Sequence, residues 1–273
     1  FIAVPEITAE YAANPLIAMT PDEILAWIRE SEPDYVPGTQ VHYSNSNYVV
    51  LGFLIEAVTG RSPSKEIEAR LIAPLGLTGT SFPLTPFMPQ PAMHGYFAES
   101  LGDPLIDVTR SNPGFPWTSG AMISTLADMH TWVKALATGS ALLSAGTLSE
   151  RNTWVGLVPN APVGYGLGIL NFRGFLGHNG GIAGYSSWML HSPDNKFTVV
   201  IVVNRAGEKG GTADPFLREI LELFPEVVPA PAAAPGSNRH TGAAAPPARH
   251  RPPAGRAASA RPPPPAATRP PSA

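Results

Sequence analysis

This 273-residue sequence predicts an α+β fold, on three observations. Helix caps and amphipathic patterns fill the first half, up to about Gly139. Apolar runs of strand type, such as Phe197–Val203, follow in the second half. No internal repeat occurs along the sequence. Because helices come first and strands later, the order of elements argues against a repeating βαβ fold.

The helices expected in the first half are indicated by capping residues at their starts and by helix-ending residues at their ends. Thr20 to Glu23 is a capping box with proline at the first helical position. Residues 76–118 are rich in proline, glycine and threonine and predict long loops. The expected helices are Thr20 to about Glu30, Asn45 or Ser46 to Gly60, Ser62 to Leu71, and Ser124 to Gly139.

Strand signals fill the second half. The expected strands are Val163–Phe172, Gly181–Leu190 and Lys196–Val203. Residues 192–195 between the last two are turn formers, so these strands should be antiparallel neighbours. A closing helix should begin at Asp214 and Pro215.

Charge and composition divide the chain near residue 228. All 21 acidic side chains lie before residue 229, whereas residues 229–273 carry six arginines and are rich in alanine and proline. We therefore expect one folded domain over residues 1–228 and a disordered tail over 229–273. A basic segment that binds an anionic envelope polymer, and an out-of-frame translation, are alternatives for the tail. It lacks interleaved aromatic residues, so no nucleic acid is expected as a partner.

Composition also excludes several classes of site. Without cysteine there is no disulfide, thiolate metal site or cysteine nucleophile. The seven histidines make no metal-ligand spacing, and the nucleophile-elbow, phosphate-loop, zinc-protease and dinucleotide motifs are missing. We expect no metal and no cofactor. No run of about 18 apolar residues occurs, so no transmembrane segment is expected.

The first candidate motif is Tyr43-Ser44-Asn45, directly before an expected helix. A tyrosine hydroxyl near a cation can lose its proton and act as a general base. The amide of Asn45 offers a donor and an acceptor to a peptide-like substrate. In the alternative interpretation, Asn45 or Ser46 only caps the helix and Tyr43 only packs.

The second candidate motif is His178-Asn179-Gly180-Gly181, which we expect to open a strand. Glycine at a strand edge presents bare backbone to a ligand. A backbone N–H there can stabilise an oxyanion. A glycine-rich turn before a strand is the alternative.

The stretch from Pro37 to Gly60 resembles the serine β-lactamase-related hydrolases, which include D-alanyl-D-alanine carboxypeptidases and class C β-lactamases. The resemblance covers about residues 20–224. It implies the penicillin-recognising serine hydrolase fold, in which a helical subdomain lies beside an antiparallel sheet with flanking helices. The further matching blocks, in family order, are Pro74–Leu77, Thr118–Asp128, Tyr165–Gly168, Gly177–Gly181 with Gly184–Tyr185, Pro193–Asp194 and Val203–Asn204.

The resemblance implies a role for each motif residue. Tyr43 would be the catalytic tyrosine, and Asn45 would contact the substrate amide. His178, Asn179 and Gly180 look like the third family motif, in which Asn179 replaces a threonine or serine. Gly181 would supply one oxyanion N–H.

The family also needs a Ser-x-x-Lys motif, in which a serine nucleophile lies one helical turn from its lysine. In the family this motif precedes the tyrosine motif by more than the 42 residues available here. The only match, Ser62 to Lys65, follows it. Charged neighbours such as Glu66 predict a solvated helix face with Ser62 as its cap. We expect Ser62 not to be the nucleophile. The sequence, which begins at Phe1, is then expected to be the C-terminal part of a longer enzyme, cut after its nucleophile helix.

By resemblance, the intact protein would be a serine hydrolase that opens a carbonyl through an acyl-enzyme. Its partner would be a small-molecule or peptide substrate, such as a peptidoglycan-type peptide, an ester or a β-lactam, in the cell envelope or outside the cell. The 273 residues alone are expected to be inactive. A non-catalytic binding or regulatory homologue and a truncated product without function are the alternatives. No oligomeric state is predicted.

Overall fold

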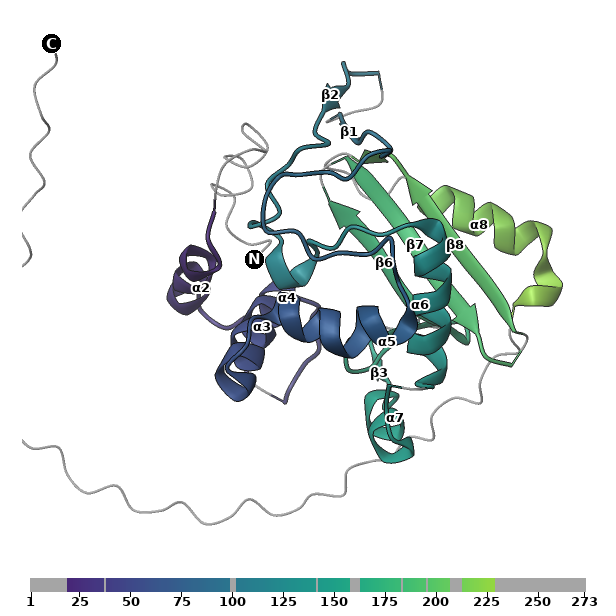
Figure 1. Cartoon of the computed structure of the whole chain (residues 1–273). Helices are drawn as coiled ribbons and strands as arrows, with labels where there is room; N and C mark the ends of the chain where they lie inside the picture. The colour runs from purple at the N-terminus through teal and green to yellow at the C-terminus, as the bar shows by residue number, and fades with distance from the viewer. Residues whose placement is uncertain are drawn as a thin grey trace, which may run out of the picture. The chain divides into compact units, whose positions relative to one another are not determined.

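A computed structural model describes residues 19–36, 38–98, 102–140, 142–157, 163–182, 184–194, 196–206 and 213–228 (Figure 1). All of these residues belong to one compact unit. The expected tail at 229–273 lies outside the described residues.

The first helices begin and end where the capping residues predict. In α2 (Pro21–Glu30) the Thr20 side chain accepts a hydrogen bond from the Glu23 N–H, and the Glu23 carboxylate accepts one from the Thr20 N–H. Helix α3 (Asn45–Thr59) ends at Gly60, whose φ of 66° is left-handed. The α2 side chain Ile24 packs with Val49 of α3 in a buried cluster.

The expected helix from Ser62 is confirmed, but it is longer and irregular. It runs as α4 (Pro63–Ile67), a π-helical turn η1 (Glu68–Ile72) and α5 (Ala73–Leu75). The other helical elements are α6 (Leu126–Thr138), α7 (Ala145–Arg151), α8 (Asp214–Leu223) and the 3-10 turns η2 (Trp117–Ser119) and η3 (Pro225–Val227).

A six-stranded antiparallel sheet forms the second half, in the order β3-β4-β5-β6-β7-β8. A smaller sheet, in the order β2-β1-β9, combines β1 (Tyr96–Phe97), β2 (Ile106–Asp107) and β9 (Arg205–Ala206). The large-sheet strands are β3 (Val155–Gly156), β4 (Val163–Tyr165), β5 (Leu170–Phe172), β6 (Phe175–Ile182), β7 (Tyr185–Ser192) and β8 (Phe197–Val203).

Two strand predictions are wrong in detail. The single strand expected over Val163–Phe172 is two strands, because the intervening glycines turn the chain between β4 and β5. The motif that begins at His178 was expected to open a strand, whereas it lies inside β6, which ends at Ile182. The antiparallel pairing of β7 with β8 is confirmed.

The two faces of the large sheet carry different helices (Figure 1). Phe175 of β6 is buried with Leu217 and Leu221 of α8, whereas its neighbour Leu176 is buried with Ala137 of α6. Successive side chains of a strand point to opposite faces. Helices α8 and α6 therefore cover opposite faces, and the chain has an α+β fold as predicted.

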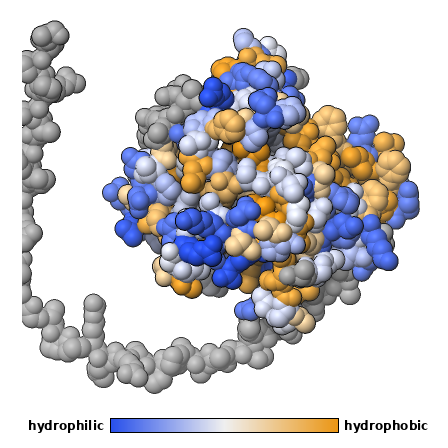
Figure 2. All heavy atoms as spheres, viewed as in Figure 1, coloured by the Kyte–Doolittle hydropathy of each residue, from blue (hydrophilic) through white to orange (hydrophobic). Residues whose placement is uncertain are grey.

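Some apolar side chains stay exposed on the helices. On α3, Val50 is 44% and Leu54 53% exposed. Phe216 and Leu223 of α8 are also exposed, and apolar side chains are visible in this region in Figure 2. Helix α3 is apolar around most of its circumference, so only part of its apolar surface meets α2, α4 and η2.

Candidate active site

Two motifs that are far apart in the sequence meet in the structure. Tyr43 lies just before α3 and His178 lies on β6, and their ring centroids are 5.8 Å apart. Tyr48, in the first turn of α3, and Tyr165, at the end of β4, lie 5.8 and 5.7 Å from Tyr43 by the same measure. We call these four residues the tyrosine–histidine cluster.

The start of α3 leaves the Asn45 side chain free of the capping role. Ser44 is the N-cap, and its hydroxyl accepts a hydrogen bond from the Ser46 N–H. Both residues named in the capping interpretation, Asn45 and Ser46, therefore lie inside the helix. The Tyr43 hydroxyl donates to the Asn45 Oδ1 at 3.2 Å. The Asn45 Nδ2 then remains as a donor for a ligand.

Close backbone packing fixes Tyr48. The Thr118 hydroxyl of η2 donates to the Tyr48 carbonyl at 2.8 Å. Helix α3 approaches η2 closely because Gly52 has no side chain. A Cβ at Gly52 would lie 2.6 Å from Thr118 and from Trp117.

The turn after β4 fixes Tyr165. A Cβ at Gly166 would lie 2.1 Å from the carbonyl oxygen of the buried Arg151, so only glycine fits there. The Arg151 guanidinium donates to the Leu136 carbonyl of α6 at 2.6 Å. The Tyr165 turn is thereby held against α6 and α7.

Hydrogen bonds connect three members of the cluster in series. The Tyr48 and Tyr165 hydroxyls are hydrogen-bonded to each other. The Tyr165 hydroxyl lies 2.9 Å from the His178 Nε2, and the His178 Nδ1 lies 2.6 Å from the Asn179 carbonyl oxygen. Both ring nitrogens of His178 therefore have a partner within the protein.

Burial keeps the cluster uncharged. Desolvation, with a smaller effect of Tyr48, raises the pKa of Tyr43 to about 12. Desolvation also raises the pKa of Tyr165 and lowers that of His178, so the imidazole is neutral at pH 7. A tyrosine acts as a general base when a cation lies near its hydroxyl. Among the described residues, no hydrogen bond or ion pair connects Tyr43 to a lysine or arginine.

The end of β6 offers unpaired backbone. Strand β5 pairs with β6 only as far as Gly177, whereas β7 pairs along the whole length to Ile182. In the described part of the chain, no strand pairs with the second edge of His178–Ile182. We call this edge the open edge of β6. Asn179 and Gly181 are exposed there, and a Cβ at Gly181 would meet nothing within 4 Å.

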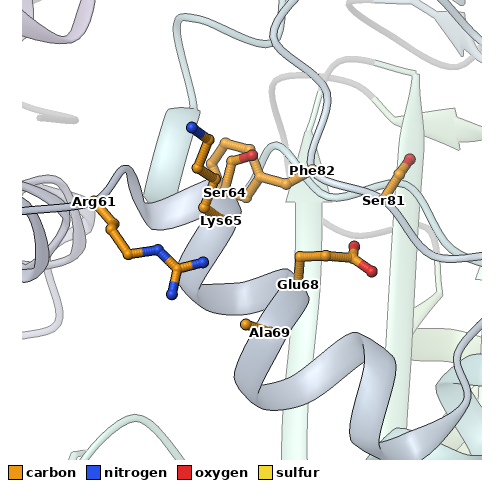
Figure 3. A pocket seen from close by; sticks show the side chains of 7 residues that line it. All are labelled: Arg61, Ser64, Lys65, Glu68, Ala69, Ser81 and Phe82. Atoms are coloured by element: carbon orange, nitrogen blue, oxygen red, sulfur yellow. The ribbon is translucent and has the colours of Figure 1, made fainter. Parts of the chain in front are cut away.

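The Ser62–Lys65 motif lies in a different setting. Ser62 is the N-cap of α4 but makes no capping hydrogen bond through its side chain. Lys65 is exposed and lines a cavity of about 330 Å³, together with Arg61, Ser64, Glu68, Ala69, Ser81 and Phe82 (Figure 3). No member of the tyrosine–histidine cluster lines this cavity.

The prediction of a fully solvated face beside Ser62 is wrong for Glu66. This side chain is buried, and its carboxylate makes ion pairs with Arg61 at 3.0 Å and Arg70 at 2.5 Å. A buried carboxylate is retained only with such partners. The pairs fix α4 against the π-helical turn η1, so this segment has a structural role.

The sequence analysis missed Tyr48 and Tyr165 as site residues. Both lie in sequence blocks that match the family, but neither block indicates that the two hydroxyls are hydrogen-bonded to each other. In the described ranges, no group of three histidine, aspartate or glutamate side chains is placed to hold a metal ion. No helix in those ranges has the length and apolar character needed to cross a membrane.

Comparisons of sequence give a consistent set of relatives. The family model described as Beta-lactamase matches residues 3–222. Protein flp of Staphylococcus aureus strain COL is 29% identical over 195 residues, which are 68% of this chain and 38% of that protein. An Escherichia coli K12 protein, provisionally named a D-alanyl-D-alanine carboxypeptidase, is 35% identical over 82 residues, 30% of this chain and 19% of that protein. The chain thus spans less than half the length of these curated relatives.

Comparisons of structure agree. A D-stereospecific amidohydrolase from Streptomyces sp. has a TM-score of 0.68 and 35% identity, over 72% of this chain and 59% of that one. A D-amino acid amidase from Ochrobactrum anthropi SV3 has a TM-score of 0.66 and 23% identity, over 77% and 65%. At 23% identity, the similarity to the D-amino acid amidase shows a shared fold only.

Proposed function

Because the chain belongs to the beta-lactamase family of serine hydrolases, we propose that it carries the substrate-binding and proton-transfer side of an acyl-transfer site. The supporting observation is that Tyr43, with its partner Asn45, and His178 meet beside the open edge of β6. In the whole reaction a serine attacks a peptide, ester or lactam carbonyl. Water then hydrolyses the acyl-enzyme.

Each residue has a proposed task. Tyr43 is the proton acceptor once a cation lies beside it, because a nearby positive charge favours the phenolate. The Asn45 Nδ2 donates to the substrate amide. The Asn179 side chain hydrogen-bonds a substrate carboxylate, and the Gly181 N–H is one oxyanion donor, a contact worth about 3 kcal/mol in comparable enzymes.

The open edge of β6 gives the substrate its orientation. An extended peptide can add to an exposed sheet edge through main-chain hydrogen bonds. The names of the Streptomyces and Escherichia coli relatives point to substrates with D-configured residues. We propose amides and peptides of D-amino acids as the substrate class, including peptidoglycan-type peptides, with β-lactams and esters as substitutes. Such peptides place the protein in the cell envelope or outside the cell.

For the 273 residues themselves we propose binding without acyl transfer. Tyr43 has a pKa of about 12 and no cationic partner among the described residues, and Lys65 is exposed and lines a cavity that no member of the cluster lines. Removing the nucleophile of a site that acts as a unit lowers the rate by roughly a millionfold.

Labelling with a fluorescent penicillin, followed by intact-mass analysis, tests this proposal. The 273-residue chain should gain no covalent adduct. A longer product of the same reading frame that supplies Ser-x-x-Lys should gain one, on that serine. An adduct on the 273-residue chain, mapped by peptide mass to Ser62, would show that Ser62 is a nucleophile. It would contradict the proposal that this chain binds without acyl transfer.

A further inference from the structure

The two hydrogen bonds of His178 define its tautomer. The Asn179 carbonyl oxygen can only accept, so the His178 Nδ1, 2.6 Å away, carries the proton. In a neutral imidazole the other nitrogen is then an acceptor. The Tyr165 hydroxyl, 2.9 Å from the Nε2, must therefore donate its proton to the ring.

The same reasoning orients the next hydrogen bond. Once Tyr165 donates its single proton to His178, its oxygen can only accept. The hydrogen bond between the Tyr48 and Tyr165 hydroxyls is then donated by Tyr48. Three residues from α3, β4 and β6 thus form one series in which every donor points toward the imidazole. Hydrogen bonds in such a series polarise and strengthen one another.

We propose that Tyr48 and Tyr165 are positioning residues that keep the Nε2 of His178 unprotonated, and thus hold the ring in the neutral Nδ1–H tautomer that the Asn179 carbonyl selects. His178 then neither transfers a proton nor supplies positive charge to Tyr43; it fixes the geometry of the β6 backbone beside the site. The tautomer assignment does not depend on the proposed function, whereas its consequence for Tyr43 rests on that function.

The surroundings of His178 favour this arrangement. Among the described residues, the titratable side chains in contact with its ring are Tyr165 of β4 and Tyr43 before α3, and Tyr48 follows Tyr165 in the series. Among the described residues, no carboxylate makes an ion pair with His178. A protonated imidazole would need both ring nitrogens to donate, which would require Tyr165 to turn its proton away from the ring.

The arrangement also indicates where the positive charge beside Tyr43 comes from. If His178 is neutral, the cation that lowers the pKa of Tyr43 has to come from outside the cluster. In a Ser-x-x-Lys enzyme the lysine can supply it. The tyrosine–histidine cluster is then a polar but uncharged part of the site, and the lysine supplies the positive charge.

Long-range ¹H–¹⁵N spectra of the histidine side chains in the ligand-free 273-residue chain test the assignment. The His178 signals are identified by their loss in His178→Gln. The wild-type chain should show a protonated Nδ1 and an unprotonated Nε2 at pH 7. An Nε2–H tautomer, or a charged ring at pH 7, would overturn the proposal without any variant being needed.

Phenylalanine substitutions test the series. Tyr165→Phe removes the donor to the Nε2, so a proton should bind there about tenfold more tightly, whereas the Nδ1 should stay protonated because the Asn179 carbonyl still accepts from it. Tyr48→Phe should keep the Nδ1–H tautomer with a smaller change in proton affinity. Tyr43→Phe is the matched control, because Tyr43 contacts the ring without hydrogen-bonding to it.

The outcomes separate the two proposals. An unchanged proton affinity of the Nε2 in a folded Tyr165→Phe chain would overturn the positioning role. An equal response to Tyr43→Phe would overturn it too, because ring packing would then be the cause. These spectra are recorded without ligand, so failure to bind a D-amino-acid amide would count against the proposed function only.

Discussion

At the scale of single residues, the surroundings of Tyr43, the proposed base, keep its hydroxyl protonated. Tyr43 is half-buried among two tyrosines and a neutral imidazole, and its phenol donates to Asn45. Burial and, to a smaller extent, Tyr48 raise the pKa of Tyr43 and so favour its protonated form. The cluster alone therefore does the opposite of what a general base requires, and a cation has to be added before Tyr43 can accept a proton.

The first prediction concerns the ionisation of Tyr43. Its signal, followed by ¹³C NMR of ring-labelled tyrosine and assigned with Tyr43→Phe, should stay that of a phenol to about pH 12. The folded pKa lies above the unfolded value of 10.0, so the stabilisation is complete below pH 10 and is lost as the pH rises toward 12. Ionisation of Tyr43 at or below pH 10 would show that a cation is already beside it.

The second prediction concerns Gly181, where an added Cβ meets open space. Gly181→Val should leave the midpoint of thermal unfolding unchanged, because valine suits a strand. It should weaken binding of a D-amino-acid amide at least about tenfold, or 1.4 kcal/mol, by filling the space beside the N–H. Isothermal titration checks this.

Gly156→Val in β3 is the matched control for Gly181→Val. A Cβ at Gly156 also meets nothing within 4 Å, and β3 is the strand at the far edge of the sheet from β8. Ligand affinity should be unchanged in this variant. An equal loss of affinity in both variants would contradict the placement of the ligand on β6.

Single residues also show which parts of the candidate site can be predicted from the sequence. Tyr43, Asn45 and His178 could be selected because each lies in a short motif. Tyr48 and Tyr165 could not, because their hydrogen bond joins residues 117 positions apart. Such a contact depends on how β4 is placed against α3, which local patterns do not encode.

At the scale of elements, the packing of α3 on η2 determines where Tyr48 lies. The absence of a side chain at Gly52 allows Thr118 to reach the Tyr48 carbonyl. Capping residues made the bounds of α2 and α3 predictable. The burial of α3 was not predictable, because the helix is apolar on several sides and the sequence does not say which side meets α2.

The third prediction follows from this contact. Gly52→Ala places a Cβ within 2.6 Å of Thr118 and Trp117, so the free energy of unfolding should fall by about 1–3 kcal/mol in urea titrations. The signal of Tyr48 should shift in the same variant.

Gly146→Ala in α7 is the matched helical control. The nearest atom to its added Cβ lies 3.9 Å away, so the variant should be stabilised by up to about 1 kcal/mol. A Gly52→Ala chain as stable as the wild type would disprove the tight packing of α3 on η2.

At the scale of the whole molecule, the fold class was predictable because helices precede strands and each has clear stop signals. The boundary of β6 was misplaced because glycines in the His178 motif resemble a turn, whereas pairing with β7 holds them in a strand.

The fourth prediction concerns the tail, which composition separates from the folded domain. Limited proteolysis should cut first beyond residue 229 and leave a core that ends near Phe224 to Val228. Intact-mass analysis of the digest identifies the end. Slow hydrogen exchange of the amides in 229–273 would contradict this and support binding of an envelope polymer by the tail.

The most direct test of the account is whether the 273-residue chain binds a D-amino-acid amide at the cluster. Titration of labelled chain with N-acetyl-D-alanine amide, and with its L-enantiomer as control, can be followed by NMR. We predict weak binding of the D-enantiomer that shifts the signals of Tyr43, His178 and Gly181, and at least tenfold weaker binding of the L-enantiomer. Equal binding of both enantiomers, or shifts confined to the cavity beside Lys65, would contradict the central claim.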